Sequence, residues 1–96
     1  MSRTAVVPGR QLWKAEIREA RNLGFKLLVS IGDTAAFARL VPESPRAKRA
    51  CREHNASAIE ANQVIPPVSA AERPNAQLEA TRDAIHSALV MAKDAA

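Results

Sequence analysis

The sequence predicts a helix-dominated α/β or α+β domain with a small sheet of two or three strands. Segments with one apolar helical face alternate with short runs in which every second residue is apolar. Glycines and prolines stand where one pattern gives way to the other. Residues 1–96 are expected to form a single domain, because no internal repeat or low-complexity linker divides them. If the weaker strands do not form, the same segments predict an all-α helical bundle.

The first two elements are an amphipathic helix over residues 9–22 and a strand over residues 25–31. Gly24 stands where a left-handed residue commonly ends a helix. The run that follows alternates apolar and other residues and is bounded by Gly24 and Gly32, which is typical of a strand. Apolar residues also recur every three to four positions across this region. One long helix is therefore the alternative, at a cost of about 1 kcal/mol for each interior glycine.

Helix-start signals mark the rest of the chain. Asp33 and Ser44 are favourable N-cap residues, and Pro45 suits the first position of a helix. Prolines confine the apolar run after residue 63 to an edge strand or a loop. The predicted segments are helices over 33–41 and 45–62, a last helix that starts at Pro74 or Asn75, and short strands over 4–7 and 63–66.

Charge is distributed unevenly along the chain. Residues 1–53 carry eleven Lys or Arg against five Asp or Glu, whereas residues 54–96 carry three against five. Four cations follow Ser44 within eight positions, and such a basic cluster favours an anionic macromolecular partner. We therefore predict a small non-catalytic binding or regulatory protein that docks on nucleic acid or on a nucleic-acid-handling complex. The predicted contact residues are Arg46, Lys48, Arg49 and Arg52, with help from Arg39.

The same cluster has other interpretations. With the helix before it and the turn at 42–45, it sketches a helix-turn-helix, although that turn has two prolines and no glycine. A solvated basic helix face is the commonest explanation of such a cluster, and contact with an acidic protein is a further alternative. Single-strand binding by base stacking is not expected, because the chain has only three aromatic residues and two of them look buried. These are Trp13, Phe25 and Phe37.

A second function class is a protein–protein interaction module, such as an inhibitor or an accessory subunit. Twenty of the 45 hydrophobic residues are alanine, so the core is thin and a partner would add buried apolar area. Trp13 and Ile17 are the predicted partner-binding residues. The last helix carries an apolar stripe that either closes the monomer or forms a two-fold homodimer. The stripe consists of Leu78, Ile85 and Leu89, flanked by Ala84, Ala88 and Ala92.

A third class is a small α/β phosphate- or nucleotide-binding domain. Arg10 and the loop 32–34 would lie at the carboxyl ends of parallel strands, where such ligands bind. Cys51 and His54 share an i, i+3 spacing with Asp83 and His86, and two such pairs could hold zinc. Nothing in the sequence brings the two helices together, so neither a metal nor another cofactor is predicted. No spacing argues for nucleophilic or acid–base catalysis, so the chain is not expected to be an enzyme.

The compartment is predicted from three features of the sequence. A single cysteine fits a reducing environment, and the first residues lack the apolar core of a secretory signal. No apolar run is long enough to span a bilayer. We expect a soluble cytoplasmic protein without a membrane partner.

Overall fold

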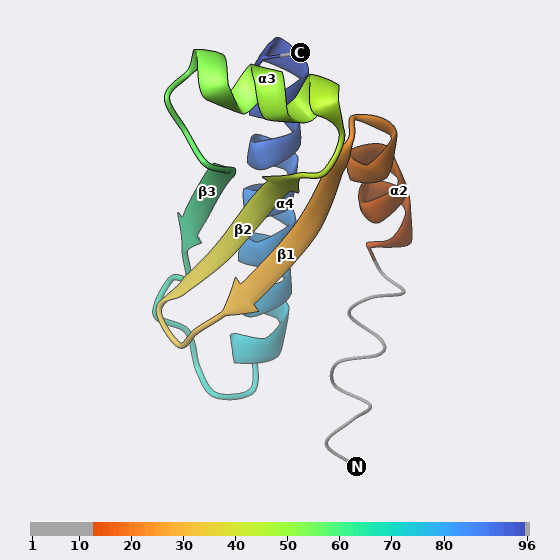
Figure 1. Cartoon of the computed structure of the whole chain (residues 1–96). Helices are drawn as coiled ribbons and strands as arrows, with labels where there is room; N and C mark the ends of the chain where they lie inside the picture. The colour runs from red at the N-terminus through yellow and green to blue at the C-terminus, as the bar shows by residue number, and fades with distance from the viewer. Residues whose placement is uncertain (1–12, 96) are drawn as a thin grey trace.

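The computed structural model describes residues 13–95, which form a three-stranded antiparallel sheet with helices packed on one face (Figure 1). The strand order β1-β2-β3 follows the chain, and both strand pairs are antiparallel. The expected helix-dominated α+β fold is confirmed, and the all-α alternative is wrong. The elements are α2 (Lys14–Asn22), β1 (Phe25–Ile31), β2 (Ala35–Pro42), α3 (Pro45–Glu53), β3 (Ile59–Val64) and α4 (Arg73–Ala95).

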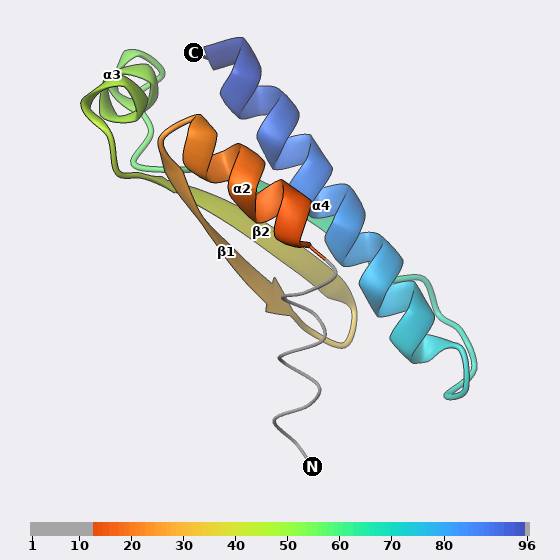
Figure 2. The ribbon, with the colours of Figure 1, turned by 90° about the vertical axis from the view of Figure 1, so that its right-hand side faces the viewer.

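The core lies between the sheet and α4. Figure 2 shows α2 and α4 on the same side of the sheet, with α3 at one end of it. Ala36, Ala38 and Leu40 of β2 face α4 and are fully buried, as is Ile85 on the helix. Small side chains on both surfaces allow the helix to lie close to the strands. The apolar stripe of the last helix therefore closes the monomer, because the helix packs it against the sheet.

The first two described elements follow the sequence. α2 ends at Asn22, and Gly24 adopts the left-handed backbone (φ 89°) that the helix stop requires. β1 covers the predicted strand, so the alternative of one long helix is wrong. The predicted strand at 4–7 and the start of the predicted first helix lie outside the described residues.

The predicted helix over 33–41 is wrong, because this segment is the hairpin turn and the middle strand of the sheet. The Gly32 N–H donates to the Ala35 carbonyl at 2.9 Å and closes the turn between β1 and β2. β1 and β3 then pair with β2 on either side and form backbone hydrogen bonds with it. Tertiary pairing of this kind outweighs the helix preference of a stretch that contains three alanines.

The predicted helix from residue 45 to residue 62 is wrong in its second half. α3 ends at Glu53, and Asn55 adopts φ 55°, a left-handed conformation that asparagine tolerates better than most residues. The chain then returns as β3, which begins at Ile59 and so precedes the short strand predicted at 63–66. Because the helix stops early, β3 reaches β2 and completes the sheet.

Candidate functional site

The basic cluster lies on α3, and the start of this helix is built as the sequence predicts. Ser44 has the extended backbone of an N-cap residue, and its Oγ accepts a hydrogen bond from the Ala47 N–H at 3.1 Å. Pro45 occupies the first turn, where its missing N–H leaves no donor unsatisfied. The helix is therefore locally well determined from its first residue.

Two contacts fix α3 to the end of the sheet. Ala47, Ala50 and Cys51 form its buried face. At its start, the N–H groups of Glu43 and Ser44 donate to the Gly24 carbonyl at 2.8 and 3.1 Å. Since its buried face and its first turn are both held, α3 presents one defined face to solvent.

Four cations occupy the exposed side of α3. They are surrounded by solvent, and none forms an ion pair within residues 13–95. Two of the ion pairs in this part of the chain instead join α4 to α2: His86 Nε2 lies 3.1 Å from Glu16 Oε2, and Lys93 pairs with Glu19. The basic surface, a name used below for these four residues, thus has no ion-pair partner among the described residues, although Glu43 and Glu53 lie at the two ends of the helix. It consists of Arg46, Lys48, Arg49 and Arg52.

Arg39, the fifth predicted contact residue, lies apart from α3 on the middle strand of the sheet. Its Nε is 3.4 Å from Glu60 Oε2 on β3, its direct neighbour in the strand register. Both side chains are more than two-fifths exposed, so water screens the pair and its contribution to stability is small. The structure therefore divides the predicted site between α3 and the sheet.

The two predicted partner-binding residues lie on or next to α2. Trp13 is 7% exposed and belongs to the hydrophobic core. The sequence favours a core position for Trp13 over a surface anchor, and its burial agrees with the core position and not with the anchor. Ile17 is half-buried one helical turn later. Of these two residues, Ile17 is thus the one that retains surface for a partner.

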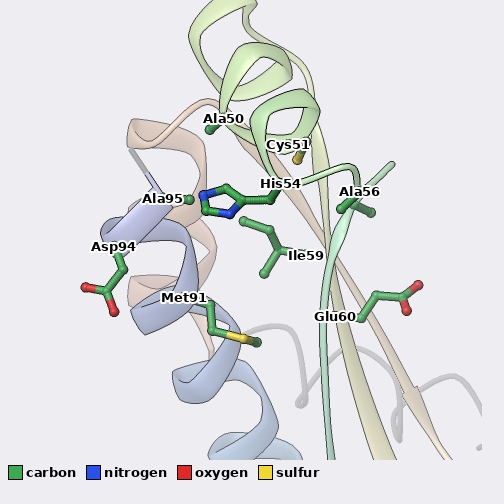
Figure 3. Close-up of a pocket in the computed structure, with 10 residues that line it drawn as sticks. Ala50, Cys51, His54, Ala56, Ile59, Glu60, Met91, Asp94 and Ala95 are labelled. Atoms are coloured by element: carbon green, nitrogen blue, oxygen red, sulfur yellow. The ribbon is translucent and has the colours of Figure 1, made fainter.

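A groove of about 400 Å³ lies between the end of α3, the start of β3 and the end of α4 (Figure 3). In the close-up, the His54 ring lies across the gap above Ile59, while the carboxylates of Asp94 and Glu60 point away from it. The residues that line the groove are mostly apolar: Ala50, Cys51, His54, Ala56, Ala58, Ile59, Glu60, Met91, Asp94 and Ala95.

The groove does not have the chemistry of a metal or nucleophile site. Burial raises the pKa of the Cys51 thiol, so the thiol stays protonated near neutral pH. The zinc alternative also needs His86, whose ring instead contacts Glu16. Within residues 13–95, no three His, Cys, Asp or Glu side chains gather closely enough to hold a metal ion.

The predicted surroundings of the loop at 32–34, a parallel strand before it and a helix after it, are wrong. The loop joins two antiparallel strands, so no helix N-terminus follows it. Its carbonyls are already bonded: Gly32 O accepts from Gln77 Nε2 at 3.1 Å, and Asp33 O accepts from Arg73 Nη1 at 2.7 Å. Arg10, the other member of that predicted site, lies outside the described residues.

Sequence reasoning missed the face of the sheet that points away from α4. Phe37 lies on this face at the centre of β2 and is partly exposed. The signal that reveals it is the alternation of Ala36, Ala38 and Leu40, which assigns every second residue of β2 to the core. A helical interpretation of the same segment hides this alternation.

Comparison with known proteins adds no assignment to this geometry. No family model matches the chain, and neither the curated proteins nor the solved structures give a match. Across residues 13–95, no helix has both the length and the apolar character needed to cross a membrane.

Proposed function

We propose that this chain is a small non-catalytic binding protein that docks its basic surface on nucleic acid or on a nucleic-acid-handling complex. One observation carries the proposal. Four exposed cations lie on a single nine-residue helix, and none of them forms an ion pair among the described residues. Elsewhere in the structure, Glu19 pairs with Lys93 and Glu60 pairs with Arg39. The cations of α3 are therefore free to bind an external anion.

The phosphate backbone is the anion that fits this arrangement best. Each Lys or Arg that neutralises a phosphate releases condensed counterions, and this release favours binding at low salt. Arginine, which supplies three of the four cations, can also bind a phosphate with two parallel hydrogen bonds. Because the buried face of α3 packs on the domain and its start is hydrogen-bonded to Gly24, these side chains extend from a helix that is held in place.

Charge reversal of the basic surface tests the proposal. The variant carries Arg46→Glu, Lys48→Glu, Arg49→Glu and Arg52→Glu, and its binding to single-stranded and duplex DNA and to RNA is titrated at several salt concentrations. We expect affinity to be lost, and four neutral Gln substitutions at the same positions to reduce the salt slope by up to roughly 3 units, about 0.7 to 0.9 for each lost phosphate contact.

The matched control reverses four exposed cations elsewhere, which gives the same change in net charge. These are Lys14, Arg18, Arg21 and Arg82, which lie on α2 and α4. We expect this control to retain most of its affinity. Equal losses in both variants would mean that net charge alone drives binding, and no loss in either would refute the proposed role of α3.

A protein–protein interaction module is the second candidate, and the groove beside α3 favours it. Met91 and Val90 lie at this end of α4 with 42% and 57% of their surface exposed. Exposed apolar side chains beside a concave surface are typical of protein contact sites. Pull-down of the chain from a native lysate separates the two candidates: recovery that nuclease abolishes supports the first, and nuclease-resistant recovery of a stoichiometric protein supports the second.

A further inference from the structure

One face of the sheet carries no helix within the described part of the chain. α2 and α4 both lie on the opposite side, and α3 lies beyond one end of the strands (Figure 2). Alternation along each strand assigns ten side chains to this open face. They are Lys26, Leu28, Ser30, Ala35, Phe37, Arg39, Val41, Glu60, Asn62 and Val64.

An aromatic ring lies at the centre of this open face. Phe37 belongs to the middle strand, and its direct partners in the register are Ser30 on β1 and Asn62 on β3. Neighbouring strands are about 4.8 Å apart, so both short polar side chains flank the partly exposed ring. The open face thus combines a flat apolar surface with hydrogen-bonding groups on either side of it.

Cations continue from this ring toward α3. Arg39 lies two residues after Phe37 on the same face, and Lys26 lies opposite Val41 near the end of the strand. From Phe37 to Pro42 the strand covers about 17 Å at 3.3 to 3.4 Å per residue, and α3 begins three residues later. The helix that carries the basic surface thus lies beyond the end of the strand toward which Arg39 follows Phe37 (Figure 2).

We infer that the open face binds single-stranded nucleic acid, with one base stacked on Phe37 and the backbone directed toward the basic surface. This inference rests on the proposed function and specifies its ligand. An exposed aromatic side chain beside a positively charged track is the arrangement with which proteins hold single strands. Ser30 and Asn62 offer donors and acceptors to the edges of the stacked base.

Charge complementarity favours this ligand over a second copy of the chain. A sheet-to-sheet interface would bury the polar side chains of Ser30 and Asn62, the direct partners of Phe37 in the register, although Leu28 and Val64 add exposed apolar surface to the same face. Two stacked copies would also bury Lys26 of each copy, which forms no ion pair among the described residues, together with the Arg39–Glu60 pair. A single strand supplies both a π-face and phosphates, and so satisfies the ring and the cations together.

The inference also reverses an expectation from the sequence. The sequence predicts no stacking because two of the three aromatic residues look buried. Two are buried: Trp13 is 7% exposed, and Phe25 on β1 is 2% exposed. The third aromatic ring, that of Phe37, is partly exposed because its segment forms strand β2 instead of the predicted helix. One well-placed ring is enough to hold one base.

Substitution of Phe37 tests the inference with the full chain and three probes. Binding of oligo-dT and oligo-U of 20 nucleotides, and of a 20-base-pair DNA duplex, is measured by fluorescence anisotropy at fixed salt. We expect Phe37→Ala to weaken binding to the single strands by about 5- to 150-fold, the range for loss of one stacked base, with the salt slope unchanged. Val64→Ala is the matched control, because Val64 is apolar and 78% exposed on the same face.

A second variant supplies a direct signal of stacking and does not depend on Phe37→Ala being folded. In Phe37→Trp we expect the affinity for oligo-dT to be retained and the added tryptophan fluorescence to be quenched on binding. The wild-type chain is the control, since its single tryptophan is buried.

Four results would overturn the inference. Unchanged affinity of Phe37→Ala together with unquenched Phe37→Trp would refute stacking, and sensitivity to reversal of the basic surface would then leave the proposed function intact. Preference of the wild-type chain for the duplex over the single strands would also refute binding of a single strand on the open face and leave the proposed function intact. Conversion of a dimer to a monomer by Phe37→Ala, seen by sedimentation equilibrium, would assign the open face to contact between copies. Failure of the wild-type chain to bind any probe would remove the proposed function as well.

Discussion

The two faces of strand β2 differ in burial, and this difference cannot be predicted from the average hydrophobicity of the strand. On the face toward α4, Ala36, Ala38 and Leu40 are fully buried. On the opposite face, the larger Phe37 and Arg39 remain partly exposed. Burial here follows the space beneath a closely packed helix and not the size of the apolar side chain. On β2, the open face therefore holds Phe37 and Arg39 with part of their surface available for binding.

The largest effect is expected where a charge is placed on the packed side. Ile85→Glu buries a carboxylate at a position that is fully inaccessible to solvent, where no cation can pair with it. The free energy of unfolding of a small domain is only 5 to 15 kcal/mol, so we expect this variant not to fold. Circular dichroism and thermal unfolding measure this.

The control for that variant lies five residues further along the same helix. Val90→Glu places the same charge at a side chain that is 57% exposed, and we expect a folded protein. If Ile85→Glu instead gave a folded chain of lower association state, α4 would be an interface in solution and its packing on the sheet would be wrong.

Local signals account for the elements that the sequence predicts correctly. The stop at Gly24, the cap at Ser44 and the proline at 45 each act through the few residues around them. The strand after Gly24 is bounded on both sides and alternates cleanly. Such features do not depend on where the rest of the chain lies, and so they can be predicted from one sequence.

The errors arise where distant pairing decides between two local options. Residues 35–42 satisfy both a helical and an alternating pattern, and only β1 and β3 on either side select the strand. The end of α3 depends on Asn55 turning the chain back toward β2. For the candidate site, the basic surface was predictable from spacing, whereas the position of Phe37 was not, because its exposure depends on the sheet.

A smaller effect is expected at the contact between Gly24, before β1, and Ser44, the N-cap of α3, which is called the corner below. Gly24→Ala places a Cβ about 2.0 Å from Ser44 Oγ and requires a side chain at φ 89°. Both the contact and the backbone are unfavourable, and we expect a loss of roughly 2 to 3 kcal/mol in the free energy of unfolding. Urea denaturation measures the loss.

Gly32→Ala is the control at the other end of β1. Its Cβ would lie 3.3 Å from the Ala35 carbonyl oxygen, a tight contact but not an overlap. We expect it to cost clearly less than Gly24→Ala. An equal cost at both glycines would show that the corner is not held by the close approach of Ser44.

The cap itself is expected to contribute less than the corner. Ser44→Ala removes the hydrogen bond that Ser44 Oγ accepts from the Ala47 N–H, and loss of an N-cap typically costs about 1 kcal/mol. Faster amide exchange confined to the first turn of α3 is the local readout. Ser44→Asp, which keeps an acceptor, should restore most of the loss; failure to do so would assign the effect to packing against Gly24 instead.

The smallest effect is expected on the open face. Val64→Thr replaces an apolar side chain that is 78% exposed by a polar one of similar shape, and we expect a change within about 0.5 kcal/mol. Ala36→Thr puts the same residue on the packed face, where there is no space for it, and should cost about 1 to 3 kcal/mol. The difference between their urea midpoints measures how unlike the two faces are. Equal midpoints would mean that the open face is covered in solution, and a base could then reach Phe37 only by displacing that cover.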